Sequence, residues 1–126
     1  MPLTFDMPWE ELQAYKGSNP KPADFDEFWG RGLQQIDATS QKPELIPSSF
    51  QTSFADCLDM YFTGVDGARI HAKLIRPTNM SGPHPAILMF HGYTDSAGDW
   101  SDKTKLGFAA AGFTVAALDC RGQGGL

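Results

Sequence analysis

The chain has 126 residues, enough for one small domain with its own core and too few for two. Ten Lys and Arg residues stand against 15 Asp and Glu residues, so the formal net charge is -5 and the pI is near 4.9. This acidic balance excludes neither enzymes nor protein partners, but it argues against nucleic acid or an anionic membrane surface, because both bind basic patches.

The first residues hold no positively charged segment followed by an apolar one, so we expect no secretory signal. No apolar stretch approaches the roughly 18 residues of a membrane span. Two cysteines, Cys57 and Cys120, make neither a disulfide framework nor a metal site, and we expect reduced thiols buried on strands. Together these features predict a soluble cytoplasmic protein that binds no membrane.

A short helix is expected near the start of the chain. Asp6 can cap it, Pro8 is tolerated in its first turn, and Trp9 and Leu12 would share one side. The segment GSNPKP, residues 17–22, then interrupts helical structure.

A second helix is predicted to begin after Asp24, which forms a capping-box pattern with Glu27. Apolar residues follow at helical spacing and give the helix one apolar face: Phe25, Phe28, Trp29, Leu33 and Ile36. Residues 40–49 contain two prolines and are expected to form a loop.

The spacing of apolar residues changes after Phe50 and predicts an antiparallel hairpin. Residues 58–63 alternate between apolar and polar, and Val65-Asp66-Gly67 is a turn signal. Residues 68–77 alternate again, with Ile70, Ala72 and Leu74 on one side and His71, Lys73 and Ile75 on the other. One side of the hairpin would be solvated, so His71 is expected at the surface, as is His84 in the loop of residues 77–85.

The next segment, residues 86–90, is apolar at every position, which is typical of a parallel strand covered on both faces. Residues 102–111 can form a helix that ends at Gly112, and residues 113–118 form a second apolar strand. The predicted fold class is therefore α/β: a helical N-terminal segment, an antiparallel hairpin, and then a parallel β-α-β unit. We expect residues 113–118 to be an unpaired edge of the sheet.

In open α/β sheets the chemistry lies at the carboxyl ends of the parallel strands. Here these ends lead into HGYTDSAGDW and DCRGQGG. We expect Gly92 to let the chain turn sharply and leave the N–H of Tyr93 unpaired. A fixed N–H donor of this kind stabilises the oxyanion in acyl transfer, and α/β-hydrolases take one such donor from the loop after the third strand.

FHGY at 90–93, GDW at 98–100 and D-x-RGQGG at 119–125, in this order, resemble the acetyl xylan esterase/cephalosporin C deacetylase family of α/β-hydrolases. FDEFW at 25–29 and the hairpin that ends in RP at 76–77 are similar to that family's first segment. The resemblance therefore covers essentially the whole chain. It implies that residues 1–126 are the N-terminal portion of a single α/β-hydrolase domain, with a helical segment at 1–49 and the first part of the central sheet at 50–126.

This resemblance implies a serine esterase that removes acetyl groups from xylo-oligosaccharides or cephalosporin C-type small molecules, without a cofactor, as an intracellular hexamer. It implies that Tyr93 is the backbone oxyanion donor and that His91 and Gly92 support it. Arg121, Gly122 and Gln123 match the family's second loop, which we interpret as architectural.

The sequence contains no G-x-S-x-G, so we expect the Ser, Asp and His of the triad beyond residue 126, and the 126-residue chain alone to be inactive. Two alternatives stay open. One is a different α/β-hydrolase, of the dienelactone hydrolase or peptidase type. The other is a truncated, non-catalytic fragment that pairs with its own C-terminal portion or with other subunits.

Several polar residues near the first strand end have simpler interpretations than catalysis. We expect His91 to hydrogen-bond the loop, because the base of this fold follows the nucleophile in the chain. Ser96 is interpreted as a loop hydroxyl, since no base accompanies it. Three carboxylates, Asp95, Asp99 and Asp102, lack the spacing of a metal loop and are expected to serve turns, with Asp99 or Ser101 capping the next helix.

Arg121 is expected to make structural contacts rather than bind an anionic substrate. The glycines at 122, 124 and 125 lack the spacing of a nucleotide-binding loop. Trp9, Trp29 and Trp100 are expected to anchor the core, and Trp100 is also a candidate for lining the substrate pocket.

Overall fold

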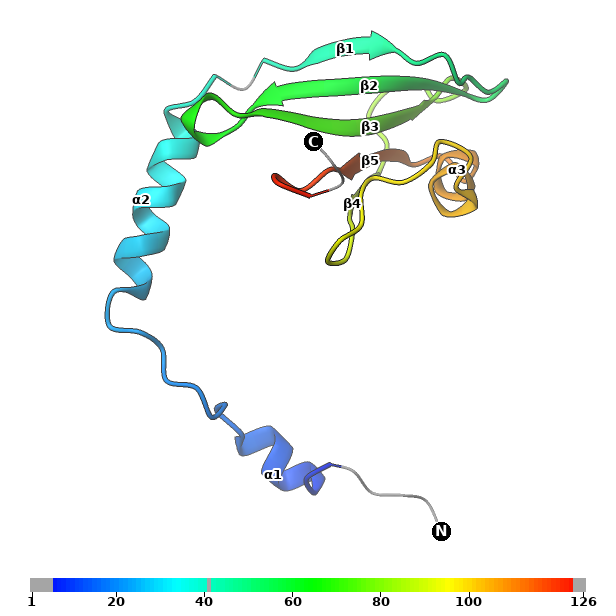
Figure 1. Ribbon diagram of the computed structural model, residues 1–126. Helices are drawn as coiled ribbons and strands as arrows, with labels where there is room; N and C mark the ends of the chain where they lie inside the picture. The colour runs from blue at the N-terminus through cyan, green and yellow to red at the C-terminus, as the bar shows by residue number, and fades with distance from the viewer. Residues whose placement is uncertain (1–5, 41, 124–126) are drawn as a thin grey trace. The chain divides into compact units, whose positions relative to one another are not determined.

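The computed structural model describes residues 6–40 and 42–123, which belong to two compact units, Met1–Gln34 and Gln35–Leu126 (Figure 1). The first unit contains α1, Trp9–Ala14. Pro8 is the residue before its first turn and offers no side-chain cap, whereas the Asp6 carboxylate accepts a hydrogen bond from the Met7 N–H at 2.8 Å. The helix is confirmed, but its predicted Asp6 cap is wrong.

The second helix, α2, spans Phe25–Asp37 and begins after Asp24 as predicted. The backbone oxygen of Asp24 accepts from the Phe28 N–H at 2.8 Å, and Arg31 pairs with Glu27 one turn earlier at 2.5 Å. Its apolar side chains are exposed rather than buried. Trp29 is 54% exposed and Trp9, on α1, is 67% exposed, so the prediction that these two tryptophans anchor a core is wrong.

Five strands form one mixed sheet in the order β1-β2-β3-β5-β4. Their bounds are β1 Glu44–Pro47, β2 Ala55–Thr63, β3 Arg69–Pro77, β4 Ala86–Phe90 and β5 Thr114–Leu118, with α3, Lys103–Ala110, between β4 and β5. β1 lies inside the predicted loop of residues 40–49, which corrects that prediction. Pro47 is compatible with it because an edge strand needs no N–H on its outer side.

The hairpin of β2 and β3 is confirmed, with Cys57 opposite Ile75 and Tyr61 opposite His71. The predicted turn is a short 3₁₀ segment, Val65–Gly67, in which Asp66 has φ 59°. A small polar residue tolerates this left-handed conformation better than a branched one.

The order of the last two strands differs from the prediction. β5 pairs with β3 on one side and, in parallel, with β4 on the other, so residues 113–118 are not an edge. In the described part of the chain β4 is the edge strand beyond β5, and its Leu88 is 70% and its Phe90 68% exposed. Burial of β4 on both faces is therefore not observed within residues 6–40 and 42–123.

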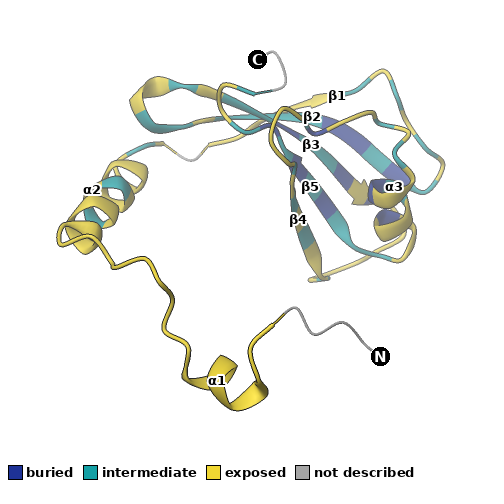
Figure 2. Cartoon of the chain, turned by 60° about the horizontal axis from the view of Figure 1, so that its bottom comes forward, coloured by how far each residue is buried: buried dark blue, intermediate teal, exposed yellow. Residues whose placement is uncertain are grey.

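The core lies on the side of the sheet that the sequence predicts to be solvated, the side of His71, Lys73 and Ile75. Cys57, Ile75 and Val115 are opposite one another in the register of β2, β3 and β5 and therefore share one face of the sheet. They are buried there with Ala55 and Ala109. α3 packs against β3 and β5 (Figure 2). His71 lies on the same face as Ile75, because the two residues are four positions apart on β3 and side chains alternate between the faces of a strand. The side expected to be solvated is thus the side that α3 and the loop of residues 91–102 cover.

No helix in the described residues is both long and apolar enough to cross a membrane.

Candidate active site

The carboxyl ends of β4 and β5 meet at one edge of the sheet, because these neighbouring strands are parallel. His91, directly after β4, joins the two loops that begin there. Its Nε2 accepts a hydrogen bond from the Cys120 N–H at 2.9 Å, and its Nδ1 lies 2.8 Å from the Gly92 carbonyl oxygen. An imidazole protonated on Nδ1 satisfies both contacts at once. His91 is thus occupied as a structural bridge between the loops.

The loop after His91 turns at residues 92–95, where the Asp95 N–H donates to the Gly92 oxygen at 3.3 Å. Thr94, not Gly92, has the left-handed backbone, with φ 66°. A Cβ at position 92 would meet nothing within 4 Å, so the expectation that this turn requires glycine at 92 is wrong. The Tyr93 side chain is exposed, and among the described residues its N–H has no hydrogen-bond partner.

A pocket of about 400 Å³ opens beside this turn, between the strand ends and the start of α3. His91, Gly92, Asp95, Asp102 and Lys105 are among its lining residues. Trp100 is not one of them. It stacks on Phe50, with ring centroids 6.3 Å apart, and packs against the core cluster, which agrees with its predicted role as a core anchor.

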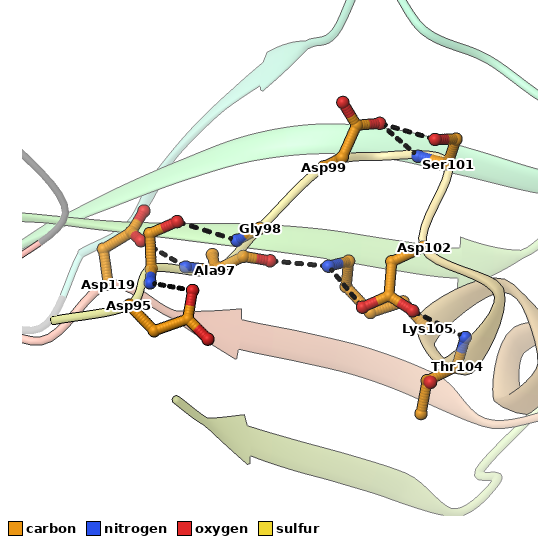
Figure 3. Close-up of polar contacts among 10 residues, drawn as sticks. Asp95, Ala97, Gly98, Asp99, Ser101, Asp102, Thr104, Lys105 and Asp119 are labelled. Carbon is orange, nitrogen blue, oxygen red and sulfur yellow. Dashed lines mark hydrogen bonds and ion pairs between the residues drawn. The ribbon is translucent and has the colours of Figure 1, made fainter. Parts of the chain in front are cut away.

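Two buried charged residues hold the loop at Ala97, and sequence reasoning missed both (Figure 3). Asp119, which follows β5, accepts from the Ala97 N–H at 2.5 Å, and Lys105 of α3 donates to the Ala97 oxygen at 2.5 Å. Asp119 is 6% and Lys105 1% exposed. The residue after Ala97, Gly98, has φ +70°, and a Cβ there would lie 3.3 Å from Lys105 Nζ. Both the backbone conformation and the close lysine favour glycine at this position.

His71 also departs from its prediction. Its side chain is 12% exposed and lies between Asp119, at 2.6 Å, and Asp59, at 2.9 Å, so it is not a surface residue. His84 is half-buried and bonds to Thr114 Oγ1 at 2.8 Å through Nε2, which also corrects its interpretation. The contacts of His71 link β2, β3 and the end of β5.

The three carboxylates of the loop serve its turns and the next helix, as predicted (Figure 3). Asp95 accepts from the Ser96 N–H at 2.8 Å, and Asp99 accepts from both the N–H and the hydroxyl of Ser101. The cap of α3 is Asp102, whose Oδ1 accepts from the Thr104 N–H at 2.8 Å, so the expected cap by Asp99 or Ser101 is wrong.

The hydrogen bond from the Thr104 N–H holds the pKa of Asp102 below its usual value. Folding therefore favours the ionised carboxylate, and the stability that it contributes is present above the unfolded pKa of about 3.9 and is lost as pH falls further. In Asp102→Asn the side-chain oxygen can still cap the helix, but it does not titrate.

We therefore expect the parent protein to lose more thermal stability than Asp102→Asn between about pH 5 and pH 3. Melting temperatures measured by circular dichroism across this range would show the difference. Parallel pH curves for the two proteins would contradict the assignment of Asp102 as the ionised cap.

The remaining candidates have structural contacts. Arg121 donates to the Val65 carbonyl oxygen at 3.2 Å, as expected of a structural residue, and Ser96 Oγ accepts from the Gly98 N–H at 3.1 Å. Gly122 has φ 77° in a turn closed by the Gln123 N–H and the Cys120 oxygen at 3.0 Å. The glycines at 124 and 125 lie outside the described residues.

Neither cysteine forms a disulfide. Cys57 is buried on β2 as predicted, whereas Cys120 is only half-buried and follows β5 rather than lying on it. Burial, with a smaller contribution from the charge of Asp56, raises the pKa of the Cys57 thiol. A thiol kept protonated in this way is a poor nucleophile, so Cys57 is a core residue.

Comparison with known proteins agrees with this arrangement. The acetyl xylan esterase (AXE1) family model matches residues 1–126. The crystal structure of acetyl xylan esterase 1 from Thermoanaerobacterium sp. JW/SL YS485 is 57% identical, with a TM-score of 0.84, over 95% of this chain and 37% of that one. The acetyl xylan esterase from Paenibacillus sp. R4 is 28% identical, with a TM-score of 0.78, over 95% of this chain and 38% of its own.

The chain thus spans well under half the length of these two proteins. Within that length it shares their fold, and the α/β arrangement predicted from the sequence is confirmed. Since the family model covers every residue and a solved member is more than half identical, the chain belongs to the acetyl xylan esterase family.

Proposed function

We propose that the protein containing this chain is a carboxylic ester hydrolase that releases acetate from acetylated xylo-oligosaccharides or cephalosporin C-type small molecules. One observation carries this proposal. In a chain of an esterase family, the Tyr93 N–H lies just after the carboxyl end of β4, follows two residues that line the pocket, and has no hydrogen-bond partner within residues 6–40 and 42–123. A rigid backbone donor at this place fits the charge that develops on an ester carbonyl oxygen.

In the proposed reaction a serine hydroxyl attacks the acetyl carbonyl carbon and gives its proton to a histidine. The carbonyl electrons move to the oxygen, which accepts hydrogen bonds from the Tyr93 N–H and a second donor. Collapse of this intermediate expels the sugar alkoxide, which takes the proton, and water then releases acetate from the acyl-serine. The serine, its acid and its base are expected in the part of the relatives' length that residues 1–126 do not span.

The supporting residues have defined places in this proposal. His91 keeps the two strand-end loops together through Cys120, and Gly92 lines the pocket without a side chain to fill it. Free Cys57 and Cys120 fit a reducing, cytoplasmic location. Hexameric assembly, or pairing with a C-terminal portion of the same protein, rests on the family resemblance, and light scattering of the active protein would test it.

The experiment is a comparison of esters and peptides as substrates. An active protein containing residues 1–126 should release acetate from acetylated xylo-oligosaccharides and cleave p-nitrophenyl acetate faster than long-chain p-nitrophenyl esters. The isolated 126-residue chain should cleave neither. Preference for peptides, for dienelactones or for long acyl chains would replace this proposal with another hydrolase of the same fold.

A further inference from the structure

The segment that contains Tyr93 is held at both ends by consecutive residues of the other strand-end loop. On one side of it His91 accepts from the Cys120 N–H, and on the other side Ala97 donates to the Asp119 carboxylate. Residues 92–96 therefore connect two residues, His91 and Ala97, that are each held by a hydrogen bond to the loop after β5. The position of the Tyr93 N–H depends on both hydrogen bonds, and Asp119 supplies one of them through its side chain.

Both oxygens of Asp119 are occupied, because Oδ1 accepts from Ala97 and Oδ2 lies 2.6 Å from His71 Nδ1. The other ring nitrogen of His71 lies 2.9 Å from Asp59 Oδ1. Each ring nitrogen of His71 therefore lies within hydrogen-bond distance of a carboxylate oxygen. The contact with His71 occupies the second oxygen of the buried Asp119 carboxylate, and the contact with Asp59 holds the other side of the His71 ring.

Packing fixes this arrangement further. The His71 ring lies against the Tyr61 ring, with centroids 4.9 Å apart, and the Asp119 N–H donates to the His71 carbonyl oxygen at 3.0 Å. Lys105 donates to the carbonyl oxygen of Ala97, in the next peptide group. Two successive peptide groups at Ala97 are therefore held, the first by Asp119 at the Ala97 N–H and the second by Lys105 at the Ala97 oxygen, which restricts rotation of this part of the loop.

We propose that Asp119 is a positioning residue for ester hydrolysis, which fixes the Tyr93 N–H through Ala97, and that His71, held by Asp59, keeps the Asp119 carboxylate oriented. This rests on the proposed function, because the position of the amide affects turnover only if the amide binds the oxyanion. Misplacement of a reacting or stabilising group by about 1 Å can cost on the order of 10²-fold in rate.

The test compares Asp119→Ala with Asp119→Asn in an active protein that contains the chain. Asp119→Ala removes both acceptors and should lower kcat for p-nitrophenyl acetate about tenfold or more, up to the roughly 10²–10³ of a lost oxyanion donor, with little change in KM. Asparagine can still accept from Ala97 and donate to His71 Nδ1, so Asp119→Asn should recover most of the lost kcat. A residue needed only for folding would not lower kcat in the folded protein while leaving KM unchanged.

Two control variants separate positioning from stability and from loss of charge. Ile75→Val weakens the core and should lower the melting temperature without lowering kcat below that temperature. Asp56→Ala removes a carboxylate that pairs with Arg76 at the surface and should leave kcat unchanged. If Asp119→Ala does not fold, His71→Phe replaces it, since phenylalanine keeps a ring against Tyr61 but donates nothing to Asp119; its kcat should fall with KM unchanged.

Hydrogen exchange, read on peptides that cover residues 91–102, gives a measurement independent of turnover. Exchange there should be faster in Asp119→Ala or His71→Phe than in the parent protein and in Ile75→Val. Full kcat and unchanged exchange in these variants would overturn the proposal. If the parent protein releases no acetate from any ester but exchange is still faster in these two variants, the proposed function is contradicted and the positioning contact stands.

Discussion

Replacing the Tyr93 peptide N–H by an ester oxygen should lower kcat for acetyl ester hydrolysis by about 10²–10³, the usual effect of removing one oxyanion donor. The change is made by incorporating the α-hydroxy analogue of tyrosine at position 93, which keeps the side chain and deletes only the donor. Since the donor acts on charge that is absent from the bound ester, KM should change little. Steady-state kinetics with p-nitrophenyl acetate would measure both constants.

The controls for this prediction use the same residue type. Tyr93→Ala should keep most of the activity, because the exposed side chain is removed and the backbone donor remains. The α-hydroxy analogue at Tyr15, in the residue that follows α1, should leave kcat unchanged. A loss of activity in Tyr93→Ala as large as that of the ester variant would assign the role to the side chain instead.

Truncating Ile75 should destabilise the protein by about 2–5 kcal/mol, which is the largest stability effect that we expect. Ile75 is fully buried between Cys57 and Val115, under α3, so Ile75→Ala leaves a cavity that rigid neighbouring strands cannot close. Urea unfolding of the parent and variant proteins would measure the difference.

A matched variant is Ile46→Ala on the edge strand β1. Ile46 is 41% exposed, so much of its side chain is already in contact with water and the loss should be at most about half that of Ile75→Ala. Equal losses at the two positions would contradict the location of the core on the α3 side of the sheet.

The sequence predicts those elements whose signals are local. The capping pattern at Asp24, the turn at Asp66 and the apolar run at 86–90 each lie within a few residues, and α2, the hairpin and β4 follow them. β1 escaped prediction because it is a four-residue strand flanked by proline, and it forms only by pairing with β2. β5 lies between β3 and β4, and this order depends on contacts between distant segments that the spacing of apolar residues along the chain does not reveal.

The same distinction applies to the site. The strand-end loops, His91 and the turn at Tyr93 can be found from the sequence, because an apolar strand that stops at His-Gly is a local signal. His71 and Asp119 lie 48 positions apart, and their contact depends on the order of the strands. Lys105 carried no signal, since a lysine on a helix is ordinarily solvated. Asp119 did carry a signal in the sequence, because a carboxylate directly after a buried strand is unusual. The left-handed backbone expected at Gly92 is found at Thr94 instead.

A structure of the active protein with serine bound to a methylphosphonate, a stable tetrahedral analogue of the acetyl intermediate, would test the central claim most directly. We predict that the Tyr93 nitrogen lies about 2.7–3.1 Å from a phosphonyl oxygen, with Ala97 still bonded to Asp119. A Tyr93 amide bonded to another part of the protein, or directed away from the phosphonate, would contradict the account.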